Sequence, residues 1–519
     1  MRLLPMRLST ARPMILFASA ALAVATLAAG CGSNYRPVVT PITPSGPAPQ
    51  PSSFAAVVSD PSPTAPGIAT IIDYSGDAVM AESPIGPGPV SFTVDATGST
   101  GYTVNSDGTL TNFQISSQLQ ARNLQYSTLL AGTNAVNLFS PSAGLWLADL
   151  NGNVADVLAG YPESFKLAVP VGATPVMIVG PGSIGERDYA ISQDFDAPTS
   201  TSPNGVACNV SPTAAPVNGE ADAIETSTDT VSAQIPLGPS TGPLLGKCPV
   251  YAVTSADTKR TFVLNRGSDT VTVINSQNNT LDACTPFVDQ TGQLVTCHPT
   301  LPLSTTAVSA SGVTPPNGTA GMKAVAGPVY AEYNATTSQL VVANYDGGTI
   351  SVIDVSLDQY GNDSPTFGTT YTIPVGRYPA SVTVLADGSR AYTADQADQT
   401  VTIVNLSSHT VEKKLAVTGH PRTVVSTQNS LFGKVYVSSP DSPYLTIIRA
   451  DLDIVDTTVL VEGNIVDVRV STQNGVSGNS NNSSRVPGYG QPCYLPPTLL
   501  DPTATGFDLH ACQLLPPAS

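Results

Sequence analysis

The four histidines of this chain, His298, His409, His420 and His510, are not spaced from one another as metal ligands usually are. Copper and zinc enzymes need clusters of histidine, so this spacing argues against that class of enzyme. Only His420 is a candidate for a binding surface, because it occupies the same kind of turn as Arg377 and Tyr378. A solvated turn residue is the simpler interpretation of His420.

Two short motifs match catalytic or nucleotide-binding patterns without the structural context that those patterns need. Residues 238–242 read Gly-Pro-Ser-Thr-Gly, but a nucleophilic serine of this type requires a strand before it and a helix after it. Residues 180–185 read Gly-Pro-Gly-Ser-Ile-Gly, and the residues that follow predict a strand where a dinucleotide site needs a helix. Both motifs therefore predict turns.

Polar residues recur in turns between predicted strands, and together they make a candidate ligand face. Its members are Asn265, Asp269, Asn344, Asp346, Arg377, Tyr378, Asp395 and His420. Asp269, Asp346 and Asp395, with Asp398, have the carboxylates that a Ca²⁺ ion prefers. The alternative is that Asn, Asp and Gly are present only because tight turns require them. We expect no cofactor, with Ca²⁺ as the alternative.

Short runs of alternating β-branched residues between turn residues predict antiparallel strands throughout the central region. After Gly376 the predicted strands are 381–385, 390–394, 400–405 and 411–417. A glycine separates one group of strands from the next, at positions 86, 132, 172, 238, 312, 376, 419 and 463. The spacing from Gly132 to Gly172 is 40 residues, which fits one four-stranded blade of a β-propeller. We predict an all-β fold, a single propeller of eight blades over residues 53–470, with seven as the alternative.

The ends of the repeat region are predicted to share one blade. Three strands, at 54–58, 68–73 and 78–83, precede the first glycine, and one strand, at 465–470, follows the last. Joining these four strands in one sheet closes the ring and removes exposed sheet edges.

The repeats resemble those of the YVTN-type β-propeller family. The resemblance rests on Val341-Val342-Ala343-Asn344, on residues 349–354 and 372–379, and on Phe262-Val263-Leu264-Asn265 as the counterpart of Tyr-Val-Thr-Asn. It covers about residues 250–465 well and 54–240 loosely. It implies the propeller fold, an extracytoplasmic setting and lactonase-like propellers as relatives, without an activity.

The N-terminal residues predict export and lipid attachment. Residues 1–30 combine three arginines with an apolar run too short for a membrane span, which indicates a signal peptide. The following Cys31 completes a sequence that resembles a bacterial lipobox, so we expect a lipid on Cys31. An ordinary secretory signal is the alternative. Residues 31–52 are Pro-rich and predict a tether, and residues 471–519 predict a low-complexity tail.

The remaining six cysteines predict disulfides, because an exported chain with an even number of them usually pairs them. Pairing by proximity gives Cys208–Cys248, Cys284–Cys297 and Cys493–Cys512. The formal net charge of −17 disfavours nucleic acid as a partner.

The sequence thus predicts a lipid-anchored monomer in the cell envelope, periplasmic or at the outer-membrane surface. We expect a binding or scaffolding module for an unknown protein or small-molecule ligand. The alternatives are a lactonase-like, metal-dependent hydrolase and a purely structural surface protein.

Overall fold

The structure is a computed structural model. It describes residues 53–471 except 63, 96, 141–143, 181–186, 194–217, 240–245, 290–291, 305–325 and 428. The predicted signal peptide, lipidation site, tether and tail lie outside the described residues, as do Cys208, Cys493, Cys512, His510 and Gly312. No helix among the described residues is long and apolar enough to cross a membrane.

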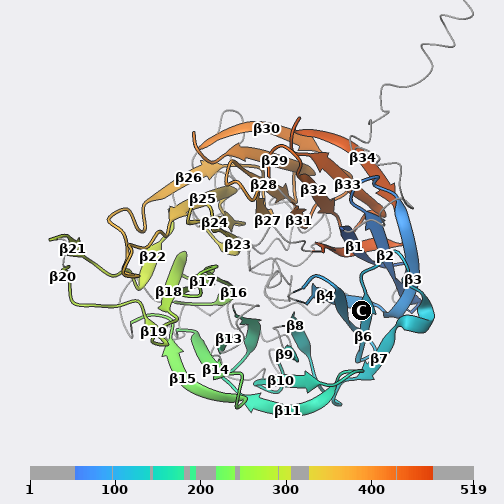
Figure 1. Ribbon diagram of the computed structural model, residues 1–519, viewed down its shortest axis with the longest axis horizontal. Coiled ribbons are helices and arrows are strands. Elements are labelled where there is room, and N and C mark those ends of the chain that lie inside the picture. The colour runs from blue at the N-terminus through green and yellow to red at the C-terminus, as the bar shows by residue number, and fades with distance from the viewer. Residues whose placement is uncertain are drawn as a thin grey trace, which may run out of the picture. The chain divides into compact units, whose positions relative to one another are not determined.

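Eight sheets form a ring of blades, which confirms the predicted β-propeller (Figure 1); seven have four strands, and in blade 5 two short strands share the place of the fourth. From the centre outward, blade 1 contains β35 (Asn464–Val470), β1 (Phe54–Asp60), β2 (Pro66–Asp73) and β3 (Val79–Pro87). Blade 2 contains β4 (Pro89–Val94), β5 (Thr100–Asn105), β6 (Thr109–Gln114) and β7 (Gln125–Thr128), with the 3₁₀ turn η1 (Ala121–Asn123) before β7. Blade 3 contains β8 (Ala135–Phe139), β9 (Leu145–Asp149), β10 (Val154–Ala159) and β11 (Ser164–Pro170).

The remaining blades follow in chain order. Blade 4 contains β12 (Pro175–Val179), β13 (Arg187–Ser192), β14 (Glu220–Glu225) and β15 (Thr230–Pro236). Blade 5 contains β16 (Pro249–Thr254), β17 (Arg260–Asn265), β18 (Thr270–Asn275), β19 (Thr280–Leu281) and β22 (Thr300–Pro302). Blade 6 contains β23 (Pro328–Asn334), β24 (Gln339–Asn344), β25 (Thr349–Asp354) and β26 (Thr370–Pro374). Blade 7 contains β27 (Pro379–Val384), β28 (Arg390–Asp395), β29 (Thr400–Asn405) and β30 (Thr410–Ala416), and blade 8 contains β31 (Thr423–Ser426), β32 (Lys434–Ser438), β33 (Tyr444–Arg449) and β34 (Ile454–Leu460).

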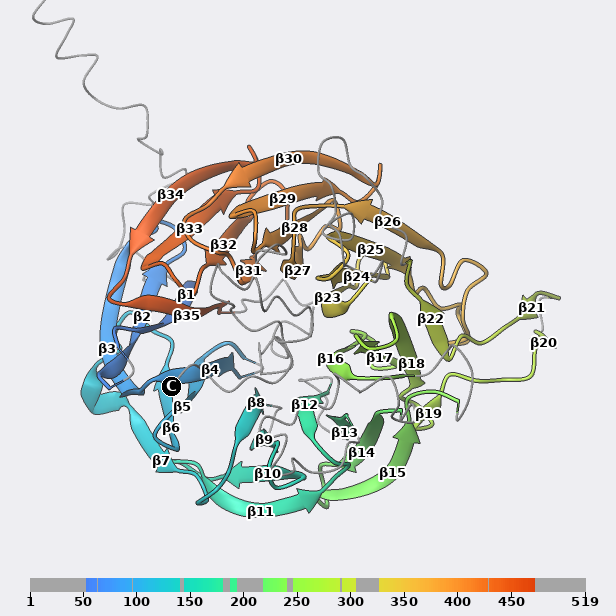
Figure 2. The ribbon, with the colours of Figure 1, turned by 180° about the vertical axis from the view of Figure 1, so that it is seen from behind.

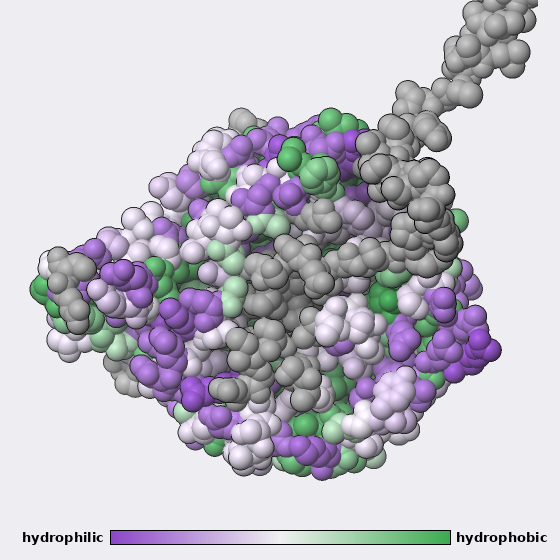
Figure 3. Space-filling view, viewed as in Figure 1, coloured by the Kyte–Doolittle hydropathy of each residue, from purple (hydrophilic) through white to green (hydrophobic). Residues whose placement is uncertain are grey.

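The inner strands contact one another in a closed circle, from β4 through β8, β12, β16, β23, β27 and β31 to β35 and back to β4. Inner and middle strands are buried along nearly their whole length, because each blade is covered by a neighbour on both faces. Outer strands such as β30 are mostly exposed, and in β30 only Leu415 is buried. On the side drawn in Figure 3, hydrophilic and hydrophobic residues form small interspersed patches, in keeping with a surface poor in charge.

Blade 1 joins the two ends of the ring, as predicted. β1 pairs antiparallel with β35, with Val57 opposite Val468. Beyond the paired strands, the Ser471 amide donates to the Phe54 carbonyl at 2.8 Å, and the Phe54 amide donates to Ser471 Oγ at 2.8 Å. The ring is therefore closed by strands that are distant in sequence.

Two of the glycines that separate the blades, Gly86 and Gly376, have a steric role. A Cβ atom at Gly376 would lie 2.4 Å from Cβ of Asp395, the last residue of β28. A Cβ atom at Gly86 would lie 2.1 Å from Nδ2 of Asn105, the last residue of β5. The link into a blade thus crosses directly over the end of that blade's second strand, and only glycine fits there.

Blade 5 has an interrupted outer strand. β19 pairs with the end of β18 and β22 with its beginning, and residues 282–299 are inserted between them. The insertion contains the hairpin of β20 (Phe287–Val288) and β21 (Leu294–Val295), which projects beyond the ring in both ribbon views (Figure 2). The Cys284–Cys297 disulfide closes its base. Cys248 is disulfide-bonded as well.

The antiparallel topology divides the connections between two faces of the ring. The link face carries the turns between second and third strands and the links from one blade to the next. The terminal face carries the other two turns of each blade, together with Ser53 and Ser471. These names are used below.

Asp188 in β13 is a buried acid whose two carboxyl oxygens have no hydrogen-bond partner among the residues that the structure describes. Burial raises the pKa of Asp188 to about 8. The folded chain then holds a proton that the unfolded chain has lost, so stability falls as pH rises from about 4 to about 8. We expect Asp188→Asn to be more stable than the parent at pH 8 by at least about 1 kcal/mol, and to show a weaker pH dependence.

Urea unfolding at pH 5 and pH 8 measures this effect. Glu82→Gln, at an exposed position of β3, is the matched control and should leave the pH dependence unchanged. If the parent and Asp188→Asn lose the same free energy of unfolding from pH 5 to pH 8, the raised pKa of Asp188 is not the cause of the pH dependence.

Candidate functional site

The last residue of the second strand fixes the adjoining turn of the link face in several blades. Asn344 Nδ2 donates to Thr349 Oγ1 at 3.0 Å and to Ser351 Oγ at 2.9 Å. Asn265 makes the same pair of bonds to Thr270 at 3.2 Å and Thr272 at 2.8 Å. The pattern arises because the third strand begins with two hydroxyl residues separated by one residue. These asparagines are buried and stabilise the fold.

Asp395 occupies the equivalent position in blade 7. It accepts hydrogen bonds from Thr393 Oγ1 at 2.8 Å, Thr400 Oγ1 at 3.1 Å and Thr402 Oγ1. Burial raises the pKa of Asp395 to about 6, although the threonine hydrogen bonds act in the opposite direction. Asp395 is therefore enclosed in its own blade and does not face an open site.

A buried ion pair joins blades 5 and 6 on the link face. Arg266 donates from Nε and Nη2 to the two carboxylate oxygens of Asp346, at 3.0 and 2.8 Å. Both side chains are almost fully buried. The guanidinium carbon of Arg266 also lies 5.4 Å from the centre of the Tyr345 ring, a cation–π geometry. Asp346 is thus already neutralised by a cation from the neighbouring blade.

Aromatic residues continue this contact into blade 7. The rings of Tyr345 and Tyr378 stack with their centres 4.9 Å apart. The Tyr345 hydroxyl donates to Oε1 of Gln396 at 2.8 Å. Tyr378 has a φ of 55°, a left-handed conformation that is uncommon for a residue of its size. Two contacts hold Tyr378 in place. One is the stack on Tyr345, and the other is the hydrogen bond from the main-chain amide of Gln396 to the Tyr378 carbonyl.

Three further candidates lie nearer the surface of the link face. Asp269 Oδ1 accepts from the amides of Ala326 and Gly327 at 3.0 and 2.7 Å, and burial raises the pKa of Asp269. The Arg377 Nε atom lies 2.6 Å from Asp398 Oδ1, and 40% of the Arg377 side chain is exposed.

The third of these candidates is His420. Its Nδ1 lies 2.6 Å from Asp441 Oδ2, and its Nε2 lies 3.2 Å from Nε2 of Gln399.

The candidate residues lie on one face, and their side chains bond to their own blade or to a neighbouring blade. The structure buries Asn265, Asn344, Asp346, Tyr378 and Asp395, and leaves Asp269, Arg377 and His420 partly exposed. Sequence reasoning placed the turns that contain Arg266, Tyr345 and Gln396 on this face but did not identify these three residues as candidates. Each directly follows the Asn or Asp that ends a second strand; Arg266 contacts Tyr345, and Tyr345 contacts Gln396. Aligning the repeats on that Asn or Asp was the signal that could have found them.

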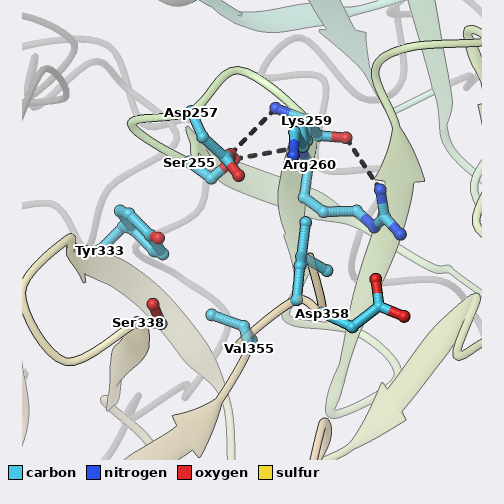
Figure 4. A pocket seen from close by; sticks show the side chains of 9 residues that line it. Ser255, Asp257, Lys259, Arg260, Tyr333, Ser338, Val355 and Asp358 are labelled. Carbon is cyan, nitrogen blue, oxygen red and sulfur yellow. Dashed lines mark hydrogen bonds between the residues drawn. The ribbon is translucent and has the colours of Figure 1, made fainter. Parts of the chain in front are cut away.

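Among the described residues, no three His, Cys, Asp or Glu side chains lie together as a metal ion would require. A small cavity lies on the terminal face between blades 5 and 6, with a volume of about 130 Å³, and is drawn in Figure 4. It is lined by Ser255, Asp257, Lys259, Arg260, Tyr333, Ser338, Val355, Leu357 and Asp358. Its lining mixes both signs of charge, and its size suits a few water molecules.

A buried charge cluster lies beside this cavity. The Arg260 Nη2 atom lies 3.2 Å from Asp282 Oδ1 and 3.1 Å from Asp363 Oδ1, and His298 Nδ1 lies 2.8 Å from Asp363 Oδ2. Burial raises the pKa of Asp282 to about 6. The cluster attaches the disulfide-closed insertion of blade 5 to the loop after β25.

Comparison with known proteins establishes the fold. No family profile and no curated protein sequence matches this chain. Among solved structures, AztD from Citrobacter koseri is similar, with a TM-score of 0.51 and 12% identity over 82% of this chain and 99% of AztD. The dihydro-heme d1 dehydrogenase NirN, solved in complex with DHE, is similar with a TM-score of 0.52 and 11% identity, over 82% of this chain and 76% of NirN. At such low identity these similarities show a shared β-propeller fold alone.

Proposed function

We propose that this chain is an exported, lipid-anchored β-propeller that acts as a binding or scaffolding module at the cell envelope. In this proposal residues 1–30 are removed and the lipid is attached to Cys31. The ring then faces the periplasm or the outer surface of a bacterial cell as a monomer. It binds a protein or a small molecule, needs no cofactor and does not bind nucleic acid.

The observation that carries the proposal is the row of contacts across blades 5, 6 and 7 on the link face. Arg266, Tyr345 and Gln396 fix the turns of three blades relative to one another. A surface that is already ordered loses little conformational entropy when a partner binds. The partly exposed Arg377 and His420 give this ordered face polar groups that can contact a partner.

The repeats also support a place among YVTN-type propellers as part of the proposal. The asparagine of that repeat corresponds to Asn265 and Asn344 here. In both blades its amide group bonds the hydroxyls that begin the third strand.

Replacement of Cys31 tests the envelope location. We expect the parent chain in the membrane fraction of a Gram-negative host, with the mass of a lipid on its N-terminal cysteine. Cys31→Ser should move the protein to the soluble exported fraction, because the acyl chains supply the membrane affinity. Ser33→Ala is the matched control. A parent chain that is soluble and carries no added mass would contradict lipid anchoring.

A photoreactive amino acid placed on the link face and, for comparison, on the outer rim of the ring tests the binding role. At position 377 on the link face it should give a saturable crosslink to one partner in intact cells. At Tyr126, on the outer strand β7, it should not. Equal, unsaturable crosslinking at both positions would contradict a binding role for the link face.

A further inference from the structure

Blade 8 exposes apolar side chains on the terminal face. Leu431 and Phe432, in the turn between β32 and β31, are each 68% exposed, and Leu452 in the turn between β33 and β34 is 54% exposed. The two turns touch, because the Ala450 amide donates to the Gly433 carbonyl at 3.0 Å. We call residues 429–433 and 450–454 the apolar turns; the two acids of the second turn, Asp451 and Asp453, are paired with Arg449 and Arg390. Adjacent exposed apolar residues of this size usually mark a contact surface.

The first of the apolar turns is held in a defined conformation. Asn429 Oδ1 accepts hydrogen bonds from the amides of Leu431 and Phe432, at 3.0 and 3.1 Å. Ser430 donates from its amide and its hydroxyl to Asp387 Oδ2, at 2.8 and 2.7 Å. The backbone therefore presents Leu431 and Phe432 outward, although a fixed turn could equally have been built from polar residues.

The apolar turns lie beside the point where the N-terminal segment enters the ring. The Tyr74 amide donates to the carbonyl of Ser53, the first described residue, at 3.1 Å. The Tyr74 hydroxyl donates to the carbonyl of Phe432. Lys434 Nζ fixes Tyr74 further, by a 2.6 Å bond to its carbonyl and a position 5.2 Å from its ring centre. Blade 8 and β1 lie side by side in both ribbon views (Figures 1 and 2).

The length of the segment before Ser53 limits the distance between a lipid on Cys31 and the apolar turns. Twenty-one residues separate Cys31 from Ser53, so a lipid on Cys31 stays within about 70 Å of the terminal face even if that segment is fully extended. A short linker gives an effective concentration near the millimolar range, which favours a weak second contact with the same bilayer. The net charge of −17 opposes anionic lipids, so the matching surface is one of zwitterionic headgroups.

We propose that the apolar turns of blade 8 insert into the interface of a bilayer with zwitterionic headgroups. The ring then lies with its terminal face toward the membrane and its link face toward the surrounding compartment. This inference rests on the proposed lipid anchor. Leu and Phe side chains are suited to this role, because their transfer out of water is favourable and because they lie beside Tyr74, which bonds to Ser53.

A tryptophan placed in the turn tests the contact directly. The chain contains a single tryptophan, Trp146, which is 1% exposed, so its background signal is constant. We would compare Phe432→Trp with Tyr444→Trp in the lipidated full chain, on phosphatidylcholine vesicles with and without brominated acyl chains. Tyr444 is the matched control, because it is 42% exposed and begins β33 on the link face of the same blade.

The expected result is a blue shift of the Phe432→Trp emission and a loss of fluorescence on brominated vesicles, with neither change for Tyr444→Trp. Vesicle-bound protein in which neither tryptophan is quenched, or in which both are quenched equally, would overturn the inference and leave the lipid anchor standing. If mass spectrometry shows no lipid on Cys31, the sulfur is coupled to a maleimide-bearing lipid and the comparison repeated. Quenching of the tryptophan at position 432 alone then supports the docking surface, although the proposed anchor has failed. If the tryptophan at position 432 is not quenched, the docking surface is overturned as well.

Discussion

Deletion of residues 464–519 is expected to prevent the ring from folding to a stable monomer. The deletion removes β35, which supplies the innermost strand of blade 1 and buries Ile465, Val468 and Asp467. Burial of two aliphatic side chains alone contributes about 3–6 kcal/mol. Loss of the strand also exposes the edge of β1 and one flank of both neighbouring inner strands. The total loss of stabilising free energy is comparable to the free energy of unfolding of a typical domain, about 5–15 kcal/mol.

Circular dichroism during thermal unfolding and size-exclusion chromatography measure this result. Deletion of residues 472–519 is the matched control, because it keeps β35 and both Ser471 hydrogen bonds to Phe54. The shorter deletion should leave the melting temperature nearly unchanged. A 464–519 deletion that melts as cooperatively and at the same temperature as the parent would show that blade 1 does not close the ring.

Arg266→Ala is expected to destabilise the protein by about 3–5 kcal/mol. The substitution leaves the Asp346 carboxylate buried without the guanidinium that holds both its oxygens. It also removes the cation above Tyr345. The double substitution Arg266→Met with Asp346→Leu should be less destabilising than Arg266→Ala, since it leaves no unpaired charge in the interior.

Urea unfolding at neutral pH gives the free energies for this comparison. Arg377→Ala is the control, because its ion pair with Asp398 is 40% exposed on the arginine side and should contribute at most about 1 kcal/mol. Equal effects of Arg266→Ala and Arg377→Ala would mean that the Arg266–Asp346 pair does not join blades 5 and 6.

Much of the fold could be predicted from local pattern. In blade 7, the strands predicted at 390–394 and 400–405 are β28 (Arg390–Asp395) and β29 (Thr400–Asn405), which agree to within one residue at each end. The alternation of β-branched residues, and the turn residues beside them, determine where these strands begin and end, and both signals are local in the sequence. The sharing of blade 1 by both ends could also be predicted, because three strands before the first glycine and one after the last leave a single way to complete a sheet.

The environment of the turn residues could not be predicted in the same way. Asp346 and Asp395 are turn acids of the same type in the sequence, yet one is paired with Arg266 and the other is enclosed by threonine hydroxyls. Those partners come from a neighbouring blade or from another strand, and spacing along the chain does not determine them. The interruption of the outer strand of blade 5 was also not predicted, since β19 and β22 are too short to carry a pattern.

The position of Phe54 has a mechanical consequence. β1 enters from the terminal face and runs along its length between β2 and β35, with hydrogen bonds to both. A pull on residue 53 away from that face acts parallel to the strand, so it loads all of these bonds at once in shear and does not peel them open one after another. A force applied to the chain before Ser53 would therefore be resisted by both ladders of β1 together.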